Sequence, residues 1–277
     1  MIIRSEFHIV TIKDIQLKII IRCLLLLILP FSAATLGMKD YKNANGLFGQ
    51  TDFDTPIINP SQFAAKHGLN RAGPYVRELC HTPGLQCVDI PKDSQWVKIF
   101  PDFTERNIMM RLNRMNVALM YRNWLVVPTN WKNLTDNEFS PMPLHRQTYH
   151  RKLLVIDLKK FAFGAYDNNG DLLRWGPASG GAQFCPLSKK SCRSATGLHT
   201  IFKMGGSNCK SRSYPVVTKG GAPMPFCMFY YKGYAIHASS LSGFVNRSRG
   251  CIRLFFNDAM WLNQKFAKIG TRVLVKR

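Results

Sequence analysis

The second part of the chain, from residue 152 to the end, carries a pattern that few folds accommodate. Short runs of apolar and aromatic residues are separated by turn signals, of which "NNG" at residues 168–170 is the clearest. The runs are "KLLVIDL", "FAFGAY", "GLHTIFKM", "MPFCMFYY", "YAIHAS" and "TRVLVKR". Strands at such short intervals predict a mainly β fold, a sandwich or a barrel.

One short helix is expected before the last of these strands. Asn257 is a favourable residue for capping its N-terminus. The apolar residues that follow at helical spacing, and are therefore predicted to share one face, are Ala259, Leu262, Phe266 and Ile269.

A small α+β module is predicted upstream, at residues 96–130. "DSQWVKIFPD" predicts a short strand, Thr104 caps a helix over residues 105–112, a second helix follows, and "WLVVP" is a closing strand. This βααβ order, with Asn113 before the second helix, resembles a LysM module, although the usual Gly-Asp-Thr near its start is absent. The resemblance implies a wall-binding module with affinity for glycan strands. Ordinary core helices are the alternative.

Two less regular segments flank this module. Residues 35–95 are rich in loop-forming residues and predict an irregular leading segment, with a short helix around residues 74–79. Residues 131–149 predict a linker, because Pro141 and Pro143 interrupt regular structure. His145 is expected to be a solvated residue of this linker.

The N-terminus has the pattern of a secretory signal. Lys18 and Arg22 precede an apolar run over residues 23–29, and Pro30 and small residues follow. The run is shorter than the about 20 residues that a membrane span needs. We therefore expect residues 1–34 to be a signal peptide and the protein to be exported to the periplasm or cell envelope. An uncleaved anchor, which would be the only membrane contact, and a start Met assigned too far upstream are the alternatives.

The chain is strongly basic, with a net charge of +22, and most of this excess lies outside the predicted signal peptide. Such a charge predicts an anionic partner, and by itself leaves nucleic acid, a membrane surface and an acidic envelope polymer open. Aromatic residues are not interleaved with Lys and Arg as they are in nucleic-acid modules. We therefore expect no specific nucleic-acid partner.

The chain has eight cysteines, of which Cys23 falls in the predicted signal peptide. In an oxidising compartment the others are expected to pair, although sequence alone does not fix the connectivity. The spacings favour three local disulfides, Cys80–Cys87, Cys185–Cys192 and Cys209–Cys227. A zinc site is the competing use of cysteine, but paired CxxC spacing is absent, and we expect neither a metal nor another cofactor. Cys251 then has no partner in this pairing, and it is either part of an intermolecular disulfide or a free reactive thiol.

Cys251 lies in "SRGCIRL", and a histidine precedes it in "GYAIHAS". A thiol becomes a nucleophile when its thiolate is stabilised and a base is close. His237 is near the end of a predicted strand, and the small-residue loop between the two segments can fold back and bring His237 to Cys251. From these residues alone, a buried core thiol and a satisfied strand histidine remain open.

Together the two segments resemble the signature of the L,D-transpeptidase catalytic domain, also called the YkuD domain. In this signature a histidine at a strand end is followed, after a loop, by Ser/Thr-x-Gly-Cys and then, one residue later, by Arg or Asn. The matching residues are His237, Ser248, Gly250, Cys251 and Arg253. The flanking hairpin, last helix and last strand are similar too, so the catalytic domain is predicted at residues 150–277.

The resemblance implies a cysteine-dependent acyltransferase that acts on peptidoglycan stem peptides and that carbapenems inhibit. Cys251 is then the expected nucleophile and His237 the base. Backbone N–H groups around Gly250 are expected to hold the oxyanion, and Ser248 to shape the turn. Arg253 is expected to meet the substrate carboxylate, with a structural ion pair as the alternative.

Two positions depart from the family pattern. Arg249 occupies a position that is often His, which leaves His237 as the only obvious base. We expect Arg249 to be a substrate-binding residue, and its charge to favour the thiolate. Ala195 occupies a position that is often Pro, which affects the edge of a loop and not the chemistry. The remaining alternatives for the function are a carboxypeptidase, an inactive wall-binding envelope protein and an exported nucleic-acid binder.

Overall fold

The computed structural model describes residue 66 and residues 73–131, 134–135, 137–186 and 189–277. All of them belong to one unit, Gln50–Arg277. The predicted signal peptide and most of the predicted leading segment lie outside the described residues. In the part of the chain that the structure describes, no helix has the length and apolar character needed to cross a membrane.

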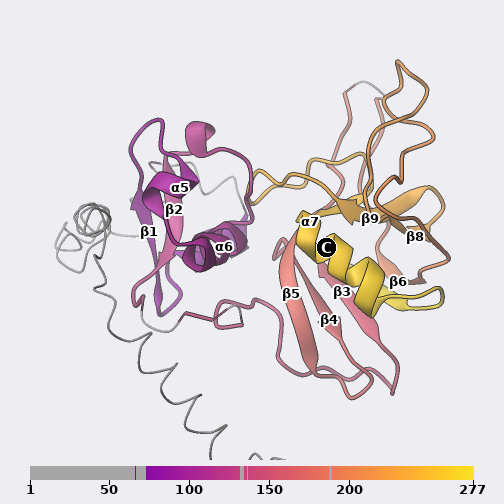
Figure 1. Cartoon of the computed structure of the whole chain (residues 1–277), viewed down its shortest axis with the longest axis horizontal. Helices are drawn as coiled ribbons and strands as arrows, with labels where there is room; N and C mark the ends of the chain where they lie inside the picture. Colours follow the sequence, from indigo (N-terminus) through magenta and orange to yellow (C-terminus); the bar gives the residue numbers. More distant parts are fainter. Residues whose placement is uncertain (1–65, 67–72, 132–133, 136, 187–188) are drawn as a thin grey trace, which may run out of the picture. The chain divides into compact units, whose positions relative to one another are not determined.

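The upstream part of the described chain is built on a two-stranded antiparallel sheet. Its elements are α4 (Pro74–Leu79), β1 (Leu85–Asp89), α5 (Trp96–Ile99), α6 (Phe103–Leu112), the 3-10 helix η3 (Leu119–Tyr121) and β2 (Trp124–Pro128). β1 pairs with β2 (Figure 1), and the Cys80–Cys87 disulfide ties the end of α4 to β1. The short helix predicted around residues 74–79 and the closing strand are therefore both present.

Several details of the predicted module are wrong. "DSQWVKIFPD" contains the helix α5 and not a strand, because Trp96, Ile99 and Phe100 are buried at helical spacing. The first strand is β1, which lies before the predicted boundary at residue 96. Asp102, and not Thr104, caps α6, since its side chain accepts a hydrogen bond from the Glu105 N–H at 2.9 Å. The predicted second helix is only the 3-10 turn η3.

The downstream part is a single nine-stranded sheet. Its strands in chain order are β3 (Leu153–Asp157), β4 (Ala162–Tyr166), β5 (Leu172–Ser179), β6 (Gly197–Thr200), β7 (Lys203–Met204), β8 (Met228–Tyr231), β9 (Tyr234–Ala238), β10 (Ile252–Leu254) and β11 (Arg272–Lys276). Their order across the sheet is β6-β11-β3-β4-β5-β10-β9-β8-β7. Figure 1 shows β3, β4 and β5 side by side. The mainly β prediction is confirmed, and the "NNG" turn joins β4 to β5 as expected.

The sheet curls because one short segment supplies both of its edges. β6 pairs with β11 at one end of the order, and β7 pairs with β8 at the other. Only Ile201 and Phe202 separate β6 from β7, and the Phe202 N–H donates to the Phe229 carbonyl at 3.0 Å. The two ends of the sheet are thus brought together, as in a partly closed barrel.

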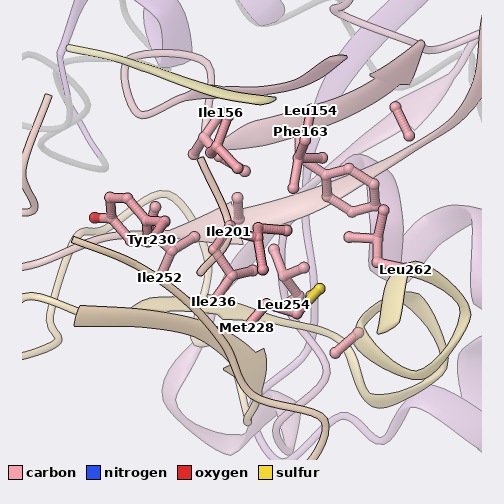
Figure 2. Close-up of a cluster of buried hydrophobic side chains, with 14 of the residues drawn as sticks. Leu154, Ile156, Phe163, Ile201, Met228, Tyr230, Ile236, Ile252, Leu254 and Leu262 are labelled. Atoms are coloured by element: carbon pink, nitrogen blue, oxygen red, sulfur yellow. The ribbon is translucent and has the colours of Figure 1, made fainter. Parts of the chain in front are cut away.

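A large apolar cluster fills the concave side of this sheet. Leu154, Ile156, Phe163, Met228, Ile236, Ile252 and Leu254 come from five different strands and are all buried (Figure 2). Leu262 packs against them from the helical segment formed by α7 (Phe256–Trp261) and the π-helix η4 (Leu262–Phe266). The burial of these side chains anchors β9 and β10, the strands that carry the candidate site.

The predicted helix near the C-terminus is present, with two corrections. Asn257 lies inside α7 and not at its cap, which is Phe255, and no side chain caps this end. Ala259, Leu262 and Phe266 are buried on one face, whereas Ile269 is 67% exposed. Ile269 leaves the apolar face because the helix ends at Phe266 and the chain turns toward β11.

The described part of the predicted linker packs on the other face of β3–β5. Met142 packs in a buried cluster with Tyr166 and Trp175. The Tyr166 hydroxyl donates to the Pro143 carbonyl at 2.9 Å, and the Lys160 ammonium donates to the Pro141 carbonyl at 2.8 Å. The prolines that interrupt regular structure therefore present carbonyl groups to the sheet.

A buried carboxylate ties α6 to the sheet and to α7. Asp258 in α7 is fully buried, and its Oδ1 accepts from Arg111 Nη2 at 2.6 Å and from Arg174 Nε at 2.8 Å. Arg111 also donates from Nη1 to the Trp175 carbonyl at 2.5 Å. The negative charge of one carboxylate thus balances two guanidinium groups, which come from elements that are far apart in the sequence.

Removal of this carboxylate is predicted to destabilise the fold strongly. Asp258→Ala leaves buried Arg111 without its anion, so we expect urea unfolding to show a loss of about 3–5 kcal/mol. Asp171→Ala is the matched control, since Asp171 and its partner His145 are 64% and 67% exposed, and we expect a loss below about 1 kcal/mol. Equal losses for the two variants would contradict this assignment.

Candidate active site

The turn before Cys251 requires glycine at position 250. Gly250 has φ 116°, a conformation that side chains with a Cβ rarely adopt. A Cβ there would also lie 2.5 Å from the Tyr234 ring, so the ring packs directly on the bare backbone. Ser248 closes the turn from inside, because its hydroxyl donates to the Cys251 carbonyl and accepts from the Gly250 N–H at 3.1 Å. The expected turn-shaping arrangement of Ser248 is therefore present.

The segment after β5 holds this turn in place. The Ser248 N–H donates to the Gly180 carbonyl at 3.0 Å, and the Ala182 N–H donates to the Ser248 carbonyl at 2.8 Å. The Asn246 side chain accepts from the Gly180 N–H at 2.7 Å and donates to the Leu158 carbonyl at 3.1 Å. The turn is thus fixed to the sheet from both sides before any substrate is present.

Parallel pairing of β9 and β10 places the two predicted catalytic side chains on the same face of the sheet. In this register Ile252 lies opposite Ile236, and Arg253 lies opposite His237. Ile236 and Ile252 point into the apolar cluster, so their alternate neighbours point to the other face. Cys251, which precedes β10, accepts from the Ala235 N–H at 3.5 Å through its Sγ. Cys251 and His237 are therefore diagonal neighbours on one face.

The Cys251 thiol is free and mostly covered. It packs beside a small cluster that contains Met224, Phe229, Ala235 and the cysteines of the Cys209–Cys227 disulfide. Burial raises the pKa of the Cys251 thiol, while the hydrogen bond from Ala235 and the charge of Arg253 act in the opposite direction. The protein at rest therefore holds a neutral thiol near neutral pH.

His237 is a neutral imidazole with a defined tautomer. The residue is 6% exposed, and burial is the main effect that lowers the pKa of its ring. The hydrogen bond to Ala238 raises this pKa, and the charge of Arg253 lowers it. Nδ1 lies 2.9 Å from the Ala238 carbonyl, which can only accept, so Nδ1 carries the proton. Nε2 is then the basic nitrogen, as a general base requires.

Arg253 is a cation whose charge acts on both groups. Arg253 lies opposite His237, and its charge lowers the pKa of both His237 and Cys251, after the larger effect of burial on each. Arg249 instead places its guanidinium 5.0 Å from the centre of the Tyr214 ring. The structure therefore favours Arg253 as the cation that stabilises the thiolate, and the expected effect of Arg249 stays a prediction.

The structure contains the three predicted disulfides, Cys80–Cys87, Cys185–Cys192 and Cys209–Cys227. Two of them flank the candidate site. The Cys209–Cys227 pair packs beside Cys251, and a Cβ on Gly181, next to the turn, would collide with the Cys192 carbonyl. Among the described residues, no three His, Cys, Asp or Glu side chains form a group that could hold a metal ion.

Sequence reasoning missed the residues that support the site. Tyr234 packs on Gly250, Asn246 fixes the turn, and the Ser194 hydroxyl accepts from the Gly181 N–H at 2.9 Å. Tyr234 and Asn246 lie within or beside the two segments of the signature, but no spacing rule assigns them a role. Each acts through a contact with a glycine backbone, which only the folded chain shows.

Comparison with known families agrees with the sequence resemblance. Residues 151–275 match the family model described as the L,D-transpeptidase catalytic domain, YkuD. No family match supports the LysM-like module, which stays a prediction. No curated protein matches the chain.

Similar solved structures include two L,D-transpeptidases that this chain covers in part. The one from Xylanimonas cellulosilytica is 24% identical over 47% of this chain and 63% of its own length, with a TM-score of 0.40. The one from Mycobacterium smegmatis is 22% identical over 46% of this chain and 59% of its own length, with a TM-score of 0.37. An L,D-transpeptidase structure from Mycobacterium tuberculosis is 18% identical over 81% of this chain and 88% of its own length, with a TM-score of 0.37.

The roles of the two arginines can be separated by titration of the thiol. The charge of Arg253 lowers the pKa of Cys251, so Arg253→Gln should raise that pKa further. We expect the iodoacetamide alkylation rate of Cys251, followed on its peptide by mass spectrometry, to rise only at higher pH than in the unmodified protein. The control Arg249→Gln should leave the profile nearly unchanged. A larger shift in Arg249→Gln than in Arg253→Gln would refute the assignment.

Proposed function

Since residues 151–275 belong to the L,D-transpeptidase catalytic domain family, we propose that this protein cross-links peptidoglycan through a thioester on Cys251. The observation that carries the proposal is the register of β9 and β10, which puts a free thiol, a neutral imidazole and a guanidinium on one face. The three groups suit a nucleophile, a general base and a carboxylate-binding residue respectively.

In the first half-reaction the Cys251 sulfur attacks the carbonyl carbon of the third residue of a tetrapeptide stem. Nε2 of His237 takes the thiol proton, which a neutral thiol and a neutral imidazole permit without a preformed ion pair. The tetrahedral intermediate collapses, the amide bond to the terminal D-Ala breaks, and His237 returns the proton to the departing amine. A thioester on Cys251 and free D-Ala are the products.

In the second half-reaction an amine of another stem attacks the thioester. His237 takes the amine proton, the carbon–sulfur bond breaks, and the thiol is restored by the same proton. The new amide joins two third-position residues. Water in place of the amine would give a free tripeptide, which is the reaction of a carboxypeptidase.

The oxyanion formed in each half-reaction needs a hydrogen-bond donor. The Gly250 N–H already donates to the Ser248 hydroxyl at 3.1 Å. We therefore assign the role to the adjacent Cys251 N–H, for which one well-placed donor lowers the barrier by about 3 kcal/mol. Gly250 contributes by leaving the approach to this N–H free of a side chain.

Arg253 is proposed to bind the carboxylate of the terminal D-Ala. Its guanidinium is half-buried, and it forms no ion pair with an acidic side chain among the described residues. The structural ion pair considered as the alternative for Arg253 is therefore not seen there. A guanidinium beside the nucleophile can orient a carboxylate by two hydrogen bonds.

The proposed substrate also accounts for the charge and the disulfides. Peptidoglycan and its neighbouring polymers are acidic, and a chain with a net charge of +22 is attracted to them, less so at high salt. Three disulfides fit an oxidising compartment such as the periplasm or cell envelope. The wall-binding role of the LysM-like module stays a proposal, as does the signal peptide.

A carbapenem should acylate this protein at Cys251. Imipenem is the probe, because one similar structure is an L,D-transpeptidase in complex with imipenem. Intact mass spectrometry should show one adduct, which peptide mapping places on Cys251 and which Cys251→Ala lacks. His237→Gln should slow acylation by about 10²–10⁴-fold, since it removes the base. If the wild-type protein stays unlabelled while its disulfides are intact, the assignment of Cys251 as the nucleophile is refuted.

The products formed from wall material test the reaction itself. Incubation with tetrapeptide-containing peptidoglycan, followed by mass spectrometry of the muropeptides, should show dimers linked through two third-position residues and loss of one D-Ala per link. Tripeptides alone would assign the site to a carboxypeptidase. Binding to sacculi without any product would assign the protein to the inactive wall-binding class.

A further inference from the structure

A cavity that Cys251 does not line lies at α6, β5 and the start of α7. A cavity of about 340 Å³ is formed by residues of α6, by Arg174 of β5 and by residues 255–258 at the start of α7. Its volume is that of a small-ligand site. No residue of the proposed catalytic machinery lines it.

Two phenyl rings at this cavity are exposed to solvent. Phe103 at the start of α6 is 66% exposed, and Phe256 at the start of α7 is 51% exposed. The Arg106 guanidinium lies 5.6 Å from the centre of the Phe103 ring, and Phe226 contacts the Phe256 ring edge to face at 5.3 Å. Neither contact removes the rings from water, so both retain apolar surface for a ligand.

Polar side chains with free hydrogen-bonding capacity lie beside the rings. Thr104, Asn107 and Asn257 line the cavity, and the described residues include no hydrogen-bond partner for these side chains. Amide side chains both donate and accept hydrogen bonds. The cavity therefore offers amide and hydroxyl groups next to apolar rings, which suits a ligand with a similar mixture.

The charged groups at the cavity are already engaged with one another. Arg111 and Arg174 both bind Oδ1 of Asp258, at 2.6 Å and 2.7 Å. The ring of Trp261 lies 5.3 Å from the Arg174 guanidinium. A phosphate or carboxylate ligand would have to compete with Asp258 for these cations, so the cavity favours an uncharged ligand.

We propose that this cavity binds a neutral sugar ring of the glycan strand. A pyranose has apolar C–H faces that can pack on Phe103 and Phe256, and hydroxyl and acetamido groups that can bond to Asn107 and Asn257. The identity of the strand as peptidoglycan rests on the proposed function. The site requires both α6 and α7, so it differs from glycan binding by the upstream module alone.

The test is titration calorimetry of the full chain with a β-1,4-linked tetramer of N-acetylglucosamine. Phe103→Ala and Phe256→Ala should each weaken binding at least about tenfold. Phe184→Ala is the matched control, because Phe184 is 55% exposed but does not line the cavity, and it should bind like the unmodified protein. Thermal unfolding of each variant verifies that its fold is intact.

The inference is overturned if the unmodified protein fails to bind the tetramer at millimolar concentration, or if the cavity variants bind it like the control. A sugar-free stem tetrapeptide that competes with the tetramer, and that no longer binds to the cavity variants, would reassign the cavity to a peptide. That result would equally overturn the inference.

Imipenem acylation of Cys251 in the same variants separates this inference from the proposed function. Unchanged acylation together with lost tetramer binding supports the sugar site. Failure of acylation in the unmodified protein refutes the cysteine mechanism, and the tetramer titration still decides the cavity.

Discussion

The parallel pairing of β9 with β10 is the constraint on which the candidate site depends. Ile236 and Ile252 are buried opposite each other, and their burial in the main cluster fixes the register. A shift by one residue would move these side chains to the wrong face, at the cost of much of the cluster. The same register sends Cys251 and His237 to the opposite face. Core packing thus positions the chemistry.

The environment of the two groups keeps both of them neutral in the resting protein. Burial disfavours both the thiolate and the imidazolium, so each group is neutral and the pair stores no charge in the absence of a ligand. Arg253 is the cation that offsets this cost for the thiolate. A bound carboxylate would partly neutralise Arg253, which links substrate binding to the charge balance of the site.

The sequence was sufficient for features that depend on local patterns. The strands of the β region, the "NNG" turn, the short helix at residues 74–79 and the three disulfides follow from alternation, turn residues and short spacings. It failed where a distant partner decides the local structure. The segment with Trp96 and Ile99 forms a helix of only four residues, which is too short for its pattern to be told from that of a strand. The first strand, β1, depends on pairing with β2, which follows later in the chain. For the candidate site, the signature supplied Cys251 and His237, whereas the contact of Tyr234 with Gly250 needed the fold.

Isolation of the acyl-enzyme tests the account most directly. The protein is mixed with a tetrapeptide stem, quenched in acid and analysed by intact mass spectrometry and peptide mapping. The account predicts a mass increase equal to the tripeptide acyl group, attached to Cys251 as a thioester that hydroxylamine removes. Cross-linked product formed without an acyl group on Cys251, or formed equally well by Cys251→Ala, would contradict it.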